Sequence, residues 1–134
     1  MKKQLEPADY ELLACAREAI TRNYDADQFN HTVGAAVRCA DGQIFTGVNL
    51  YSLHGACAEQ VALGAAITAG ERDFTCIVAV RGAQGEEVVP PCGNCRQILL
   101  DYAPKCAVIL EDTDDGMFKQ YAEELLPFAY RMEG

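Results

Sequence analysis

The chain has 134 residues, of which 20 are acidic and 11 are basic, so its formal net charge is −9. This length predicts a single domain over residues 1–134, with one hydrophobic core. The charge argues against a polynucleotide partner, because affinity for nucleic acid comes largely from Lys and Arg at the phosphates. Any substrate is therefore expected to be a small molecule.

The compartment is predicted from what the sequence lacks. Acidic residues such as Glu6, Asp9 and Glu11 interrupt the first twenty positions, and no run approaches the roughly 18 apolar residues of a membrane span. We therefore expect a cytoplasmic protein with no membrane partner. Seven cysteines, an odd number in a reducing compartment, are expected to be metal ligands, catalytic groups or core residues rather than disulfides.

Hydrophobic spacing and turn residues predict an alternation of helices and strands. The continuous apolar run at 74–80 is typical of a strand buried on both faces, and Asp41-Gly42 between two β-type runs predicts a hairpin. Alternating strands and helices imply an α/β fold, a three-layer α/β/α domain around a central mixed sheet of about five strands. The expected helices are 7–24, 57–69 and 92–103, the strands 33–39, 44–49, 74–80 and 106–110, and an acidic turn at 111–116 precedes a short strand at 118–121 and a helical turn at 123–126.

Three cysteines lie at the starts of two predicted helices. Cys57 comes two residues before Glu59, while Cys92 and Cys95 form a Cys-x-x-Cys motif. The positive ends of the two helix dipoles would favour thiolates there. Three protein ligands on zinc leave a fourth position open, which is the pattern of a catalytic site. Glu59 would face that position and carry a proton, and Arg96 would donate a hydrogen bond to a sulfur.

Two other interpretations of these cysteines are open. His54 could join Cys57, Cys92 and Cys95 in a closed structural zinc site without catalysis. Cys92-Gly-Asn-Cys95 could also be a thioredoxin-like dithiol, although the usual neighbouring Trp is absent. The structural zinc site leaves Glu59 without a role.

Several segments together resemble the cytidine deaminase superfamily. They are Val33-Gly-Ala-Ala36, the hairpin at 41–49, Cys57-Ala-Glu59 and Pro91-Cys-Gly-Asn-Cys-Arg-Gln97. The resemblance implies one Zn²⁺ per chain on Cys57, Cys92 and Cys95, and a homotetramer with active sites near subunit interfaces. It also implies that Glu59 takes a proton from the attacking water and passes it to N3 of the pyrimidine and to the ammonia leaving C4.

Departures from the nucleoside enzymes point to the blasticidin S deaminase-like subgroup. A ribose-binding glutamate is missing, since the residues after the second strand are Asn49-Leu50-Tyr51, and the loop to Cys57 is short. His31-Thr32 and the ending Glu124-Leu-Leu-Pro127 also resemble that subgroup.

The resemblance to that subgroup also implies a set of substrate contacts. Thr32 would offer a hydroxyl to the pyrimidine or sugar, and Asn49 would be a polar contact of the sugar. Tyr51 would shape the pocket, and Tyr130 in the C-terminal tail would help to close it. Blasticidin S, a cytosine nucleoside with a cationic tail, is the favoured substrate, and cytidine or deoxycytidine is the alternative. The roles of His31 and His54 stay open.

Overall fold

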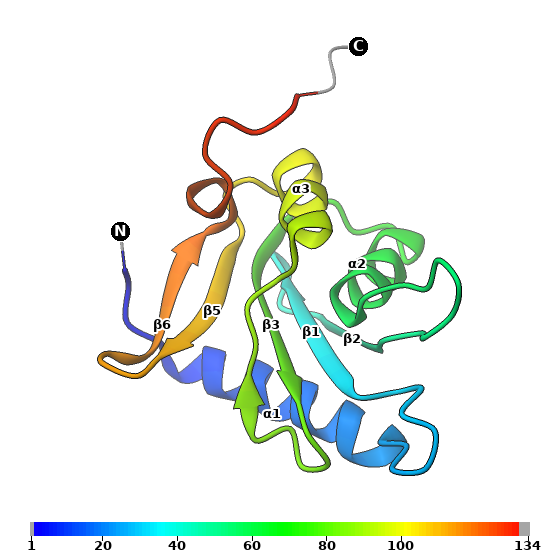
Figure 1. Cartoon of the computed structure of the whole chain (residues 1–134). Coiled ribbons are helices and arrows are strands. Elements are labelled where there is room, and N and C mark those ends of the chain that lie inside the picture. Colours follow the sequence, from blue (N-terminus) through cyan, green and yellow to red (C-terminus); the bar gives the residue numbers. More distant parts are fainter. Residues whose placement is uncertain (1, 132–134) are drawn as a thin grey trace.

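Six strands form one mixed sheet at the centre of the molecule, with helices on both of its faces (Figure 1). A computed structural model describes residues 2–131 of the chain. The helices are α1 (Pro7–Asn23), α2 (Ala58–Thr68), α3 (Gly93–Tyr102) and the 3-10 helix η1 (Ala122–Leu125). The strands are β1 (Val33–Cys39), β2 (Ile44–Val48), β3 (Phe74–Arg81), β4 (Glu87–Val88), β5 (Ala107–Asp112) and β6 (Gly116–Tyr121).

The strand order confirms the predicted mixed sheet. Five strands lie in the order β2-β1-β3-β5-β6, with β3 and β5 parallel and the other neighbours antiparallel. The sixth strand, β4, was not predicted. Its two residues pair with the end of β3 through Val80 opposite Val88 and Arg81 opposite Glu87, and two residues are too few to show an alternating pattern.

Alternate residues of the central strands pack on opposite faces of the sheet. On β3, Val78 packs in the cluster that includes Leu12 and Ile20 of α1, while Ile77 packs in the cluster that includes Leu63 of α2 and Leu99 of α3. Because both faces are covered, the strands are apolar throughout rather than alternating. The predicted α/β/α arrangement is confirmed, with α1 packed on one face and α2 and α3 on the other (Figure 1).

The turn after β5 is shorter than the predicted acidic turn at 111–116. Strand β5 continues through Asp112 and β6 begins at Gly116, so only residues 113–115 form the turn. The Asp112 carboxylate accepts the backbone N–H of Asp114 at 3.0 Å, and Gly116 has a φ of +68°. Glycine adopts that conformation without strain, so the chain reverses tightly and both flanking segments remain paired.

The segment before α1 lies along the outer side of β6. Lys3 pairs with Lys119 through two backbone hydrogen bonds of 2.8 Å. Lys119 is 7% exposed, and its ammonium group contacts Asp9 of α1. Among residues 2–131, no helix combines the length and hydropathy that crossing a bilayer requires.

Candidate active site

Two cysteines occupy the positions immediately before α2 and α3. Cys57 and Cys92 both have extended backbone conformations and are the N-terminal caps of these helices. The Cys92 sulfur accepts the backbone N–H of Cys95 at 3.4 Å, one turn into α3. Both sulfurs therefore lie at helix N-termini, where the first backbone N–H groups have no partner within the helix.

The three predicted metal ligands come together. The sulfurs of Cys57, Cys92 and Cys95 all lie within 4.8 Å of one another, and those of Cys57 and Cys92 are 3.5 Å apart. Zinc–sulfur bonds of about 2.3 Å in a tetrahedron would separate two sulfurs by about 3.8 Å. The arrangement in the structure thus fits a zinc ion with little movement of the side chains.

The three thiols differ in how readily they ionise. Burial raises the pKa of Cys95, and burial followed by the neighbouring Cys92 thiol raises that of Cys57. Burial acts in the same direction on Cys92, but hydrogen bonds from the backbone N–H of Cys95 and from the Cys57 thiol outweigh it and lower the pKa of Cys92. A bound divalent cation would favour the thiolate form of all three.

Glu59 is the second residue of α2 and is only 8% exposed. Burial raises the pKa of its carboxyl group, while its own backbone N–H opposes this effect. A carboxyl group with a raised pKa keeps its proton to a higher pH than an exposed glutamate does. Glu59 is therefore suited to proton transfer beside the three thiols.

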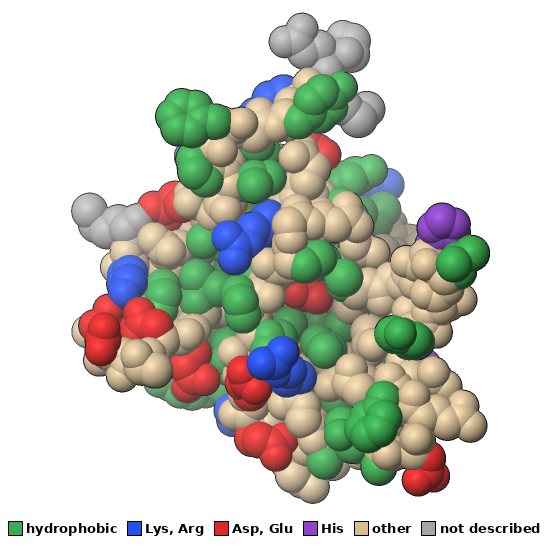
Figure 2. Space-filling model, viewed as in Figure 1, with side chains coloured by type: hydrophobic (Ala, Val, Ile, Leu, Met, Phe, Trp, Pro, Cys, Tyr) green, Lys and Arg blue, Asp and Glu red, His purple; other side chains and the backbone are tan. Residues whose placement is uncertain are grey.

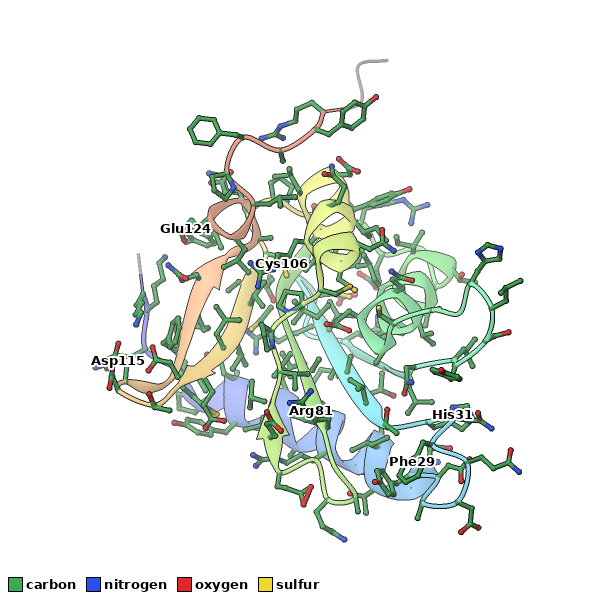
Figure 3. All side chains as sticks on the ribbon, in the orientation of Figure 1. Phe29, His31, Arg81, Cys106, Asp115 and Glu124 are labelled. Carbon is green, nitrogen blue, oxygen red and sulfur yellow. The ribbon has the colours of Figure 1, made fainter. Side chains whose placement is uncertain are left out.

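A cavity of about 480 Å³ opens over these residues. Cys57, Glu59 and Cys92 line it, whereas Cys95 is buried and is not among the lining residues. This volume is within the range of pockets that hold small ligands. In Figure 3 the segment before α3 and the start of α2 lie close together in front of the sheet.

Comparison with known proteins identifies the family. The model of the cytidine and deoxycytidylate deaminase zinc-binding region matches residues 7–111. The chain belongs to the cytidine and deoxycytidylate deaminase family. The matched residues include all three cysteines and Glu59. The family resemblance that the sequence motifs indicated is therefore confirmed.

Individual relatives agree with this family assignment. The chain is 40% identical to the blasticidin-S deaminase of Bacillus cereus over 131 residues, 91% of each chain. It is 37% identical to the cytidine deaminase of Halalkalibacterium halodurans over 106 residues, 75% of this chain and 78% of the relative.

A solved structure shows that the likeness extends to the fold. The crystal structure of cytidine deaminase from Burkholderia pseudomallei matches with a TM-score of 0.74 and 31% identity. The match covers 90% of this chain and 98% of that one.

The predicted substrate contacts of the deaminase are divided between two places. Asn49 and Tyr51 line the cavity, and Tyr51 is 77% exposed. Thr32 is not among the residues that line it, and its backbone N–H donates to Oδ1 of Asn49 at 2.8 Å. Tyr130 also lies outside the cavity, since the tail runs past α3 (Figure 1), where the Tyr130 carbonyl accepts a hydrogen bond from Gln97.

Arg96 contacts backbone carbonyls rather than a sulfur. Its Nε donates to the carbonyl of Pro91 at 2.8 Å and its Nη1 to that of Leu125 at 3.1 Å. The guanidinium group therefore connects the segment before α3 to η1. No local sequence pattern predicts this contact, because it depends on how η1 packs on α3.

Gln60 is the side chain that donates toward a thiol. Its Nε2 lies 3.8 Å from the sulfur of Cys95, and its Oε1 accepts the backbone N–H of Cys57 at 3.4 Å. Sequence reasoning missed this residue. Its signal was the glutamine three positions after a helix cap, which is the spacing of a capping box.

The two histidines have separate surroundings. His54 lines the cavity but does not join the cluster of Cys57, Cys92 and Cys95 that the described residues form, so the structure does not support the closed four-ligand alternative. His31 contacts the carbonyl of Asn49 through Nδ1 at 2.8 Å, which joins the segment before β1 to the segment after β2.

Proposed function

We propose that the protein is a zinc-dependent hydrolytic deaminase of a free cytosine nucleoside or a cytosine-nucleoside antibiotic. The observation that carries the proposal is the presence of Glu59 and two of the three clustered thiols in the wall of one cavity. Removing an amino group from a pyrimidine ring needs an activated water and a proton carrier in the same place.

Each residue of the site has a definite task in this reaction. Cys57, Cys92 and Cys95 would hold one Zn²⁺, which would supply the Lewis acidity needed to activate water at neutral pH. Glu59 would take a proton and deliver it first to N3 of the ring and then to the leaving ammonia. Gln60 would keep the Cys95 sulfur oriented through Nε2.

Blasticidin S is the favoured substrate. The relative from Bacillus cereus, named a blasticidin-S deaminase, is 40% identical over 91% of this chain. Asn49-Leu50-Tyr51 also lacks the acidic residue expected for ribose binding, and both Asn49 and Tyr51 line the cavity. Cytidine and deoxycytidine are the second candidates, supported by the cytidine deaminases among the relatives.

We also propose a cytoplasmic homotetramer. The loop after β2 exposes three apolar side chains beside the cavity: Leu50, Tyr51 and Leu53 are 52%, 77% and 93% exposed. Hydrophobic side chains also stand out at the tail end of the molecule in Figure 2, where Phe128 and Tyr130 are exposed. Grouped apolar surface of this kind is typical of subunit contacts.

Ultraviolet absorbance of the zinc-loaded protein tests the function. Cytidine, deoxycytidine, cytosine and blasticidin S are offered separately, and the loss of the cytosine chromophore is followed. We expect the highest kcat/KM with blasticidin S. A higher value for cytidine would reverse the order of substrates, and no reaction with any of the four would overturn the proposed function.

A further inference from the structure

Arg81 is the one Lys or Arg side chain among the described residues that line the cavity. It is the last residue of β3, and its strand partner on β1 is Val33, which lines the same cavity. Figure 3 shows Arg81 on β3 next to β4. Apart from Glu59, no Asp or Glu is among these lining residues, so Arg81 is the cavity's permanent positive charge.

Glu87 holds the Arg81 guanidinium group from one side only. From β4, its two carboxylate oxygens accept hydrogen bonds from Nε at 2.9 Å and Nη2 at 2.8 Å. Within the part of the chain that the structure describes, Arg81 makes side-chain hydrogen bonds through Nε and Nη2 and none through Nη1. One edge of a planar, five-donor group is thus fixed, and the remaining donors are free to meet a second acceptor.

Stability does not explain this pair. Both side chains are more than half exposed, and exposed ion pairs contribute about 0–1 kcal/mol. Strand β4 is also held without it, because Val88 is buried opposite Val80 and the Val89 N–H donates to the Ala79 carbonyl at 3.0 Å. The pair is better explained as a way of orienting a cation at the cavity.

We propose that Arg81 binds an anionic group on the sugar portion of the cytosine nucleoside, a carboxylate or a phosphate, and that Glu87 orients it for this contact. The inference rests on the proposed function, because it assumes that the cytosine ring lies at Glu59 and the thiols. Guanidinium groups match the geometry of both anions, with two donors on two oxygens. A long polynucleotide remains excluded, since the net charge is −9 and the cavity offers one cation.

Calorimetric binding tests the inference without requiring turnover. The probes are cytidine, cytidine 5′-monophosphate and cytidine-5′-carboxylic acid, titrated into zinc-loaded Glu59→Gln protein with and without Arg81→Gln. We expect Arg81→Gln to raise the ratio of the anionic Kd to the cytidine Kd by about 10- to 100-fold. Arg81→Lys should restore only part of that preference, because it keeps the charge but loses the planar fork.

A matched variant separates direct contact from general charge. Arg22→Gln removes the same charge from an exposed position on α1, where the arginine pairs with Glu18, and should leave the ratio unchanged. A change with the phosphate alone would assign the site to nucleotides, and a change with the carboxylate alone would assign it to sugar acids. The inference would be overturned if the ratio of the anionic Kd to the cytidine Kd were the same with and without Arg81→Gln for both anions.

The ultraviolet assay keeps this outcome separate from that of the proposed function. If the zinc-loaded wild-type protein deaminates none of the cytosine compounds, the function fails, while the binding ratio still decides the role of Arg81. If deamination occurs and the ratio does not depend on Arg81, only the anion site is wrong.

Discussion

The ammonium nitrogen of Lys119 on β6 lies 2.8 Å from Oδ2 of Asp9 on α1, and Asp9 is completely buried. Nη2 of Arg38 on β1 contacts the other oxygen of the same carboxylate at 3.1 Å. One buried negative charge thus connects a helix to two separate strands. Such a group is costly to leave unpaired, so its partners are as important as the charge itself.

Replacing Asp9 should destabilise the fold strongly. Asp9→Asn leaves the buried Lys119 with only the exposed Glu6 carboxylate, 4.0 Å away, as a counter-charge among the described residues. We expect the free energy of unfolding to fall by about 3–5 kcal/mol. Urea denaturation followed by circular dichroism measures this loss. Glu18→Gln on the same helix breaks only the exposed pair with Arg22 and should cost about 0–1 kcal/mol. Equal losses in the two variants would show that the buried pair has no special importance.

The same carboxylate predicts how stability depends on pH. Burial alone would raise the pKa of Asp9, but the Glu6 N–H, Lys119 and Arg38 outweigh it and lower the pKa below its usual value. The stabilisation is therefore fully present above the unfolded pKa of about 3.9 and is lost as the pH falls through the lower folded pKa. The gap in unfolding free energy between wild type and Asp9→Asn should narrow on acidification below about pH 4. A constant gap would contradict this assignment.

A glycine on β2 permits the close approach of α2. A Cβ atom at Gly47 would lie 2.6 Å from the backbone nitrogen of Ala62, so Gly47→Ala must displace the helix that carries Glu59. We expect a loss of about 1–3 kcal/mol in unfolding free energy. Gly64→Ala, on the exposed side of α2 with nothing within 4 Å, should instead gain about 0.5–1 kcal/mol. Thermal denaturation of both variants checks the opposite signs.

Local patterns were sufficient for most of the fold and for the cluster of three thiols. Cys92 and Cys95 share one helical turn, so their proximity follows from spacing alone, and Cys57 joins them because it caps the neighbouring helix. The long apolar runs of β3 and β5 could be identified because burial on both faces leaves no polar position.

Contacts that depend on packing between distant segments could not be predicted. Arg96 contacts Leu125, 29 positions later, and Arg81 meets Glu87 only because β4 folds back on β3. The placement of Tyr130 depends on where the tail runs after η1, and no local pattern fixes that course. Sequence spacing therefore predicted the thiols and Glu59 better than the surrounding pocket.

Gln60 should influence metal binding without forming part of the reaction. Gln60→Glu keeps an oxygen for the Cys57 N–H but loses the Nε2 donor near the Cys95 sulfur. We expect zinc affinity to fall by about 10- to 100-fold, as measured by competition with a chelator. Helix content in circular dichroism should be retained. Unchanged zinc affinity would show that the 3.8 Å contact with sulfur is unimportant.

Glu59→Gln should separate metal binding from turnover. The amide has the same shape as the carboxyl group but cannot carry the proton, so we expect about one zinc per chain to be retained and kcat to fall by about 10²- to 10⁴-fold. Metal analysis and the ultraviolet assay on one preparation measure both quantities. A fully active variant would disprove the proton-carrying role.

The strand-like pairing of Lys3 with Lys119 also affects how the protein behaves at high concentration. It covers the outer side of β6, which would otherwise present unpaired backbone groups to other molecules. Removing residues 2–4 would therefore do more than shorten a surface segment. It would open a sheet edge to pairing between molecules, so self-association should appear in the shortened protein before the folded core is lost.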